Sequence, residues 1–210
     1  MSESKLELDK VSIALNGKQL LTVDSSVGPG EVLTIMGPSG SGKSSLLAYI
    51  AGFLAPVFEA SGGVFVNGDD ITPLPAERRR VGLLFQDPLL FPHLSIAGNL
   101  RFAIDDRSAD KASLIRQGLD EVGLGGFEER DPGTLSGGQE SRIALLRLLL
   151  SSPNAVLLDE PFSKLDSQLR AEMRTLVFSK LRASGLPSIL VTHDQADADS
   201  AGGEIITLEQ

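Results

Sequence analysis

Residues 37–44 follow the pattern G-x-x-x-x-G-K-S. Where glycine leaves out a side chain, the backbone can wrap round a phosphate chain with its N–H groups pointing inward. The ammonium of Lys43 can reach the β- and γ-phosphates, and the hydroxyl of Ser44 can bind Mg²⁺. The pattern therefore predicts a loop for a nucleoside triphosphate with Mg²⁺. The residues expected to hold the phosphates are Gly37, Pro38, Ser39, Gly40, Ser41, Gly42, Lys43, Ser44 and Ser45.

The segments around this loop favour the same interpretation. Residues 33–36 are an apolar run that indicates a strand, and residues 45–50 have the composition of a helix. A strand before and a helix after distinguish a phosphate-binding P-loop from a Gly/Ser-rich turn that fits by chance. The positive end of the helix would face the same phosphates.

Two carboxylates end a second apolar run. Residues 155–158 are continuously apolar, which indicates a strand of a parallel sheet buried on both faces. Ligands of such sheets bind at the carboxyl ends of the strands. Asp159 suits the outer coordination sphere of Mg²⁺, and Glu160 suits the base that orients or deprotonates an attacking water, a role worth ~10²–10⁴-fold in rate. The alternative is an acid pair at a solvated strand end.

Two further polar residues follow predicted strands. His193 ends the apolar run 188–192, and Gln86 ends the run 81–85. A lone histidine is usually structural, but one at the carboxyl end of a parallel strand can reach the γ-phosphate. The basic triplet 78–80 before Gln86 is expected to be a solvated turn and not a phosphate site.

A second helix start lies between residues 135 and 140. Ser136 stands three residues before Gln139, which is a capping box and places the free N–H groups of a helix at Gly137 and Gly138. Such a helix end can bind an anion. The alternative, an ordinary start of a core helix, stays open on these residues alone.

Composition excludes several classes of function. The net charge of −9 argues against a nucleic-acid partner, and the absence of cysteine excludes disulfides, thiolate zinc sites, iron–sulfur clusters and cysteine nucleophiles. No apolar run approaches the ~20 residues of a membrane span, and the charged amino terminus lacks the core of a secretory signal. We therefore expect a soluble, cytoplasmic protein whose membrane part, if any, is a separate subunit.

The remaining patterns complete an α/β fold. A hairpin over 6–23 and a strand over 63–68 predict a small antiparallel sheet beside the nucleotide, and 111–122 has helical spacing. A further helix is expected through 169–181 and a last strand over 205–208. The predicted fold is a P-loop NTPase (RecA-like) with a mostly parallel sheet core, an antiparallel β subdomain and an inserted α-helical subdomain. We expect one domain, 1–210, in which 1–88 and 151–210 form the nucleotide-binding core and 89–150 the helical subdomain.

The order of these motifs resembles the ATP-binding subunit of an ABC transporter, over nearly the whole chain. The motifs that carry the resemblance are the P-loop, Gln86, the run Leu135-Ser136-Gly137-Gly138-Gln139, the pair Asp159-Glu160, the run Ser163-Lys164-Leu165-Asp166, and His193.

The resemblance implies a head-to-tail pair of identical chains. Each ATP would lie between the P-loop of one copy and Ser136, Gly137, Gly138 and Gln139 of the other, and hydrolysis would let the copies part. Asp166 would lie at the seam, and Gln86 would bind Mg²⁺ or the water while reporting to a membrane subunit. Glu160, His193 and Gln86 would be the catalytic residues.

The segment 85–95 resembles that of bacterial importers, where it borders the groove for a permease's coupling helix. The implied partners are integral membrane permease subunits with a substrate-binding protein, on the cytoplasmic face of the inner membrane. The runs Pro-Ala-Glu-Arg-Arg-Arg and Leu-Phe-Pro-His look like the corresponding runs of ATP-binding subunits that serve thiamine, metal-ion or small-anion uptake. A soluble ABC-type ATPase acting on a cytoplasmic assembly without a permease is the alternative. An exporter subunit and a non-hydrolysing scaffold are less favoured.

Three features depart from the family pattern. Many relatives place an aromatic near Leu15 to stack on adenine, and no Tyr or Trp is near it here. Lys164 replaces a usual small residue in the seam loop, and we expect this change to alter how the two sites communicate. The chain ends without an appended regulatory domain, so regulation through such a domain is not expected.

Overall fold

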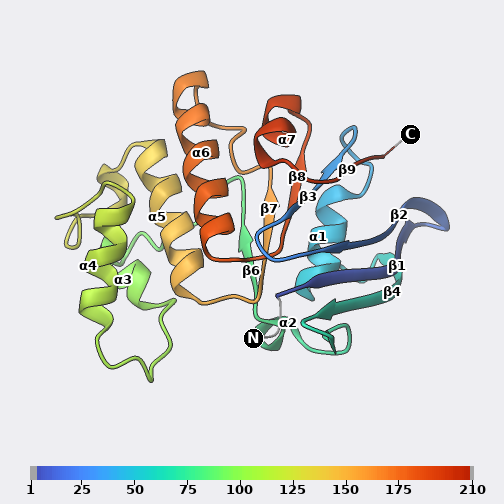
Figure 1. Ribbon diagram of the computed structural model, residues 1–210, viewed down its shortest axis with the longest axis horizontal. Helices are drawn as coiled ribbons and strands as arrows, with labels where there is room; N and C mark the ends of the chain where they lie inside the picture. Colours follow the sequence, from blue (N-terminus) through green and yellow to red (C-terminus); the bar gives the residue numbers. More distant parts are fainter. Residues whose placement is uncertain (1–3, 209–210) are drawn as a thin grey trace.

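The computed structural model describes residues 4–208, which form two sheets and the helices that pack on them (Figure 1). The central sheet is parallel and has the spatial order β6-β7-β8-β3-β9. Its strands are β3 (Val32–Met36), β6 (Val81–Leu84), β7 (Ala155–Asp159), β8 (Ser188–Thr192) and β9 (Ile205–Thr207). The predicted α/β P-loop architecture is therefore confirmed.

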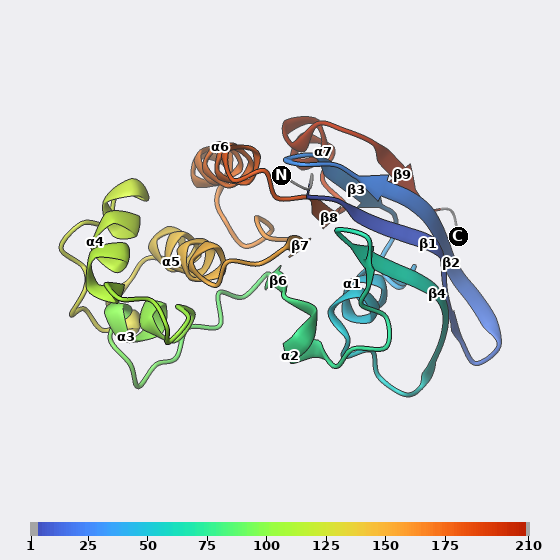
Figure 2. The same ribbon diagram turned by 60° about the horizontal axis from the view of Figure 1, so that its bottom comes forward.

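Both faces of this sheet are covered, which explains the continuous apolar runs. Leu157 packs in one cluster with helix α1 (Lys43–Ala51), whereas its neighbours Val156 and Leu158 pack in the other cluster with α6 (Ser167–Ala183). Successive residues of a strand point to opposite faces, so an alternating set of residues supplies each cluster. Figure 2 shows α1 and α6 on opposite sides of the parallel strands. The short helix α7 (Gln195–Ala201) follows β8.

The second sheet is antiparallel and has the order β2-β1-β4-β5. Its strands are β1 (Leu6–Leu15), β2 (Lys18–Val27), β4 (Phe58–Val66) and β5 (Asp69–Asp70). The predicted hairpin is confirmed, but β4 begins at Phe58 and not at the expected Gly63. The reason is long-range pairing with β1. Phe58 stands opposite Leu15 and Ala60 opposite Ile13, so the last residues of β1 hold residues before Gly63 in the strand.

The helical region lies at one end of the parallel sheet (Figure 1). It contains α3 (Ile96–Arg101), α4 (Lys111–Glu121), a 3₁₀ turn (Pro132–Thr134) and α5 (Gly137–Leu150). Helix α5 divides its side chains between two cores, because Ile143 packs with α3 and α4 and Leu145 packs with the sheet. The division of the chain at residues 89 and 150 stays a prediction. Within residues 4–208, no helix has both the length and the apolar character needed to cross a bilayer.

Arg79 corrects the expectation of a fully solvated basic triplet. Its neighbours Arg78 and Arg80 are exposed, but Arg79, the last residue of α2 (Ala76–Arg79), is buried. Its Nη1 donates to the carbonyls of Tyr49 (2.7 Å) and Ile50 (2.9 Å), near the end of α1. Its Nε donates to Leu74 O (2.8 Å) and its Nη2 to Thr72 O (2.5 Å). Burial lowers the pKa of the guanidinium, and these four bonds hold the cation in place.

We expect Arg79→Ala to lower the free energy of unfolding by roughly 2–4 kcal/mol, because it leaves buried carbonyls without a donor. Urea unfolding followed by circular dichroism measures this. Arg78→Ala removes the same side chain from an exposed neighbouring position and is the matched control, with a change below about 0.5 kcal/mol. Equal effects of the two substitutions would show that the four bonds contribute nothing.

Candidate functional site

The P-loop joins β3 to α1 and folds back on its own lysine. Gly42 is buried at a φ of 89°, a left-handed conformation that favours glycine, and it caps the start of α1. Lys43 is 6% exposed, and its Nζ donates to the carbonyls of Gly37 (2.8 Å) and Pro38 (2.7 Å). These bonds hold the ammonium inside the loop. Ser39 and Gly40, at the tip of the loop, are exposed.

The next residue connects the loop to the acid pair. The Ser44 Oγ donates to Oδ1 of Asp159 at 3.1 Å, across from α1 to the end of β7. Burial raises the pKa of the Asp159 carboxyl, and Glu160 adds to this, while Ser44 and Lys43 oppose it. A hydroxyl beside a carboxylate is an oxygen donor set that fits Mg²⁺, which usually takes one or two protein ligands together with phosphates and water. Within residues 4–208, no group of three or more His, Cys, Asp or Glu side chains is placed to hold a metal ion.

The raised pKa of Asp159 gives a pH dependence with a defined sign. The folded protein binds this proton more readily than the unfolded chain, so the carboxyl contributes less stability as the pH rises through its folded pKa. We expect Asp159→Asn, in EDTA, to raise the free energy of unfolding at pH 8 and to have a smaller effect at pH 4. Urea titrations at both pH values test this, with exposed Asp69→Asn as the control. A lower stability of Asp159→Asn at pH 8 would contradict it.

Glu160 and His193 meet where two neighbouring strands end. Strands β7 and β8 are parallel with Asp159 opposite Val191, and the Glu160 N–H donates to Val191 O at 2.9 Å. The Nδ1 of His193 lies 3.1 Å from Oε1 of Glu160. Glu160 has a φ of 45°, which is uncommon for a residue with a side chain and costs backbone energy. Such strain, in a carboxylate that lines the P-loop cavity, favours a functional role for Glu160.

A charged cluster that the sequence analysis did not identify fixes the loop that carries His193. Asp194 caps α7 and accepts from Arg170 (2.9 Å) and Arg174 (3.3 Å) of α6. Burial would raise the pKa of Asp194, but hydrogen bonds and these guanidinium groups lower it overall. The Thr192 hydroxyl accepts from the Asp194 N–H at 3.1 Å. The two arginines four residues apart on one helix were the available sequence signal.

The capping box at the start of α5 is confirmed, but its residues do not line the cavity beside the P-loop. Ser136 Oγ accepts from Gln139 N at 3.4 Å, and Gln139 Oε1 accepts from Ser136 N at 3.0 Å. A Cβ on buried Gly138 would come within 2.6 Å of the methyl carbons of Leu169, so a side chain there would force Leu169 to move. A Cβ on exposed Gly137 would meet nothing within 4 Å. The fold of the single chain therefore gives no reason for glycine at position 137.

The cavity beside the P-loop has a volume of about 350 Å³. Among the described residues, its lining comes from the loop, α1, Glu160 and the antiparallel sheet, and it includes none of residues 136–139. Gln86 and Asp166 also lie outside it. Gln86 is exposed beside Pro161, and Asp166 caps α6 by accepting from Leu169 N at 3.0 Å. One chain thus joins the P-loop to Asp159, Glu160 and His193. Gln86, Asp166 and residues 136–139 do not line its cavity.

An ion pair connects the two loops that carry Gln86 and Asp166. The Lys164 ammonium donates to the carboxylate of Asp87, next to Gln86. Both side chains are about half exposed, so the pair adds little stability. The unusual lysine in the predicted seam loop therefore links that loop to the segment expected to face a permease.

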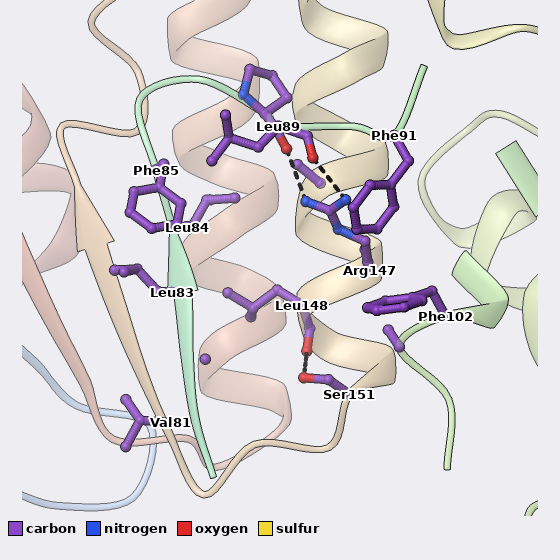
Figure 3. A pocket seen from close by; sticks show the side chains of 14 residues that line it. Val81, Leu83, Leu84, Phe85, Leu89, Phe91, Phe102, Arg147, Leu148 and Ser151 are labelled. Carbon is purple, nitrogen blue, oxygen red and sulfur yellow. Dashed lines mark hydrogen bonds between the residues drawn. The ribbon is translucent and has the colours of Figure 1, made fainter. Parts of the chain in front are cut away.

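A separate groove of about 610 Å³ lies between β6 and the helical region (Figure 3). Its edge carries Phe102, which is 74% exposed and stands edge-on to Phe91 at 5.0 Å between ring centroids. Arg147 of α5 donates to the carbonyls of Leu89 and Pro88, each at 3.0 Å. Burial lowers the pKa of this guanidinium. Arg147 therefore holds the segment after Gln86 against the helical region.

Comparisons with known proteins agree with these features. The ABC transporter family model matches residues 20–163. The "Uncharacterized ABC transporter ATP-binding protein YnjD" of Escherichia coli is 45% identical over 196 residues, which cover 91% of this chain and 90% of that protein. The thiamine import ATP-binding protein ThiQ of Cereibacter sphaeroides is 44% identical over 92% of this chain and 83% of its own length. The spermidine/putrescine import ATP-binding protein PotA of Mesoplasma florum is 37% identical, and the chain spans 60% of its length. The chain belongs to the ABC transporter family, as one of its ATP-binding proteins.

Proposed function

We propose that this protein is the ATP-hydrolysing subunit of a bacterial importer. The observation that carries the proposal is the meeting of Lys43, Ser44, Asp159, Glu160 and His193 at one edge of the parallel sheet. ATP would lie with its phosphates on the P-loop. Glu160 would accept a hydrogen bond from the attacking water, and His193 would keep the carboxylate oriented toward it. Mg²⁺, held by Ser44 with Asp159 beside it, would neutralise charge on the phosphates.

We infer further that two copies of the chain complete each site. Gly137 is exposed, and its own chain does not require a glycine there, which fits a close approach by another molecule. The start of α5 would then reach the ATP on the partner's P-loop, with Asp166 at the seam. Bound ATP would join the two chains, because each chain supplies only one of the two positive helix ends.

The partner of this dimer would be an integral membrane permease. The relatives named above include import proteins for thiamine and for spermidine/putrescine, and the groove edged by Phe102 offers apolar surface next to the Gln86 loop. The protein would then sit on the cytoplasmic face of the membrane, with a substrate-binding protein supplying the cargo. Import names among the relatives disfavour a soluble ATPase without a permease. The cargo itself would be chosen by the permease and its binding protein.

A tagged Glu160→Gln variant, isolated from native membranes in mild detergent with Mg·ATP, tests the partner. We expect a polytopic membrane protein to co-purify, and we expect Phe102→Glu in the same background to lose it, because a charge in the groove would have to be desolvated. Phe53→Glu changes a ring that is also exposed (50%) and serves as the control. Recovery of soluble proteins alone would contradict the importer.

A further inference from the structure

The turn that follows Glu160 is bonded back to the carbonyl of Glu160. The Ser163 N–H donates to Glu160 O at 3.2 Å, and the Ser163 hydroxyl donates to the same oxygen at 2.9 Å. The left-handed backbone of Glu160, with a φ of 45°, persists only where the surrounding contacts impose it. The position of Ser163 therefore helps to set the backbone that carries the Glu160 carboxylate.

The guanidinium of Arg170, in the first turn of α6, bonds both to this turn and to the loop that carries His193. Its Nη2 donates to the carbonyls of Ser163 and Leu165, each at 3.2 Å. Its Nη1 donates to Oδ2 of Asp194, the residue after His193, at 2.9 Å. Both charged side chains are only about a quarter exposed, so water and salt screen the pair less than a surface pair. One side chain thus connects the two loops that carry Glu160 and His193.

We propose that Arg170 is a positioning residue that keeps Glu160 and His193 in contact during ATP hydrolysis. The inference rests on the proposed function, which makes Glu160 the base and His193 its orienting partner. The bond from Glu160 N–H to Val191 O fixes the backbone where the strands end, but the His193 side chain is 65% exposed, so packing alone does not hold its ring. A guanidinium suits this role because its nitrogens bond in fixed directions to two separate loops.

Arg182 provides a matched control on the same helix. Its Nη2 also donates to two carbonyls, those of Ser200 at 3.1 Å and Ala201 at 2.9 Å. Both carbonyls belong to the last residues of α7, whereas Asp194 caps the start of that helix. Arg182→Gln therefore removes bonds of the same kind and leaves the turn after Glu160 intact.

Steady-state ATP hydrolysis by the full chain is the first test. We expect Arg170→Gln to lower kcat about 10- to 100-fold and to leave KM within about twofold, because a displaced base slows the chemical step while the P-loop is unchanged. Arg170→Lys keeps the charge but has one nitrogen in place of the fork, so its kcat should fall at least about tenfold. Arg182→Gln should hydrolyse ATP as wild type does.

Asp194→Asn tests the same connection from the other loop. It neutralises the partner of Arg170 and keeps a side-chain oxygen that can accept from Ala196 N, as Asp194 does at 2.8 Å. We expect kcat to fall at least about tenfold here too. This variant and Arg170→Lys decide the question even where Arg170→Gln does not fold, and far-UV circular dichroism at the assay temperature checks each variant.

NMR of the histidine rings measures the contact without nucleotide. The chain has only two histidines, and His93, in the segment 85–95, is the internal reference. With Arg170 present, Glu160→Gln should shift the ring signals of His193 and leave those of His93 in place. In the Arg170→Lys background, the same substitution should shift the His193 signals by at most about half as much, because ring and carboxylate no longer meet.

A wild-type kcat in folded Arg170→Lys or Asp194→Asn would overturn the proposal. An equal loss of kcat in Arg182→Gln would also overturn it, because any arginine of α6 would then have the same effect. So would a His193 response to Glu160→Gln that is the same in both backgrounds, because Arg170 would then stabilise the fold without setting the contact. Wild-type protein that does not hydrolyse ATP would instead refute the proposed function.

Discussion

Glu160→Gln is expected to reduce steady-state ATP hydrolysis by about 10²–10⁴-fold while leaving the Kd for ATP within a few-fold of wild type. The amide has the shape of the carboxylate but cannot accept the proton of the attacking water. The backbone bond from Glu160 N–H to Val191 O, at 2.9 Å, and the left-handed backbone remain. The loss should therefore appear in kcat and not in KM.

A coupled assay for released phosphate measures the rate, and calorimetry measures the binding. Glu172→Gln is the control, because it neutralises an exposed carboxylate on α6 that pairs with Arg142 at 3.3 Å, outside the cavity. We expect this control to hydrolyse ATP as wild type does. Turnover of Glu160→Gln at the wild-type rate would show that another group activates the water.

Mixing two inactive variants is expected to restore hydrolysis if the sites are shared between chains. Lys43→Ala removes the ammonium that the P-loop holds, and Gly137→Asp puts a charge where a partner's phosphates would lie. Each variant alone should lose at least about 100-fold in rate. In a mixed dimer, the Gly137→Asp chain supplies an intact P-loop and the Lys43→Ala chain supplies an intact α5 start. These two parts meet at one of the two sites, and the other site is doubly defective. If half of the dimers are mixed, about a quarter of wild-type activity should return.

The matched control mixes Lys43→Ala with Glu160→Gln. Both residues come from the chain that carries the P-loop of a given site, since Lys43 and Glu160 line one cavity of one chain. No mixed dimer of this pair has an intact site, so no activity should return. Recovery in the control, or none in the test mixture, would contradict the head-to-tail arrangement.

Local sequence patterns predicted much of the fold. The capping box of Ser136 and Gln139 depends on residues three apart, and the apolar run before Asp159 depends on burial of a single strand. Both signals are complete within a few residues, so they can be read without tertiary contacts. The meeting of Glu160 and His193 also follows from the rule that parallel strands end at one edge.

Other features depend on contacts between distant segments. Burial of Arg79 requires the end of α1, about 30 residues away, and local charge alone indicated a solvated turn. The pair Lys164–Asp87 and the position of Phe58 opposite Leu15 are likewise set by tertiary packing. Spacing in one sequence carries no information on these partners.

The molecular mass of Glu160→Gln in solution, measured by multi-angle light scattering with and without Mg·ATP, tests the ATP-joined dimer most directly. Without nucleotide we expect the mass of one chain, because in the proposed dimer the bound ATP is what joins the P-loop of one copy to the α5 start of the other. With saturating Mg·ATP we expect twice that mass, and Gly137→Asp in the same background should abolish the increase. A single-chain mass at saturating Mg·ATP, with ATP bound by calorimetry, would contradict the proposal that two copies enclose the nucleotide.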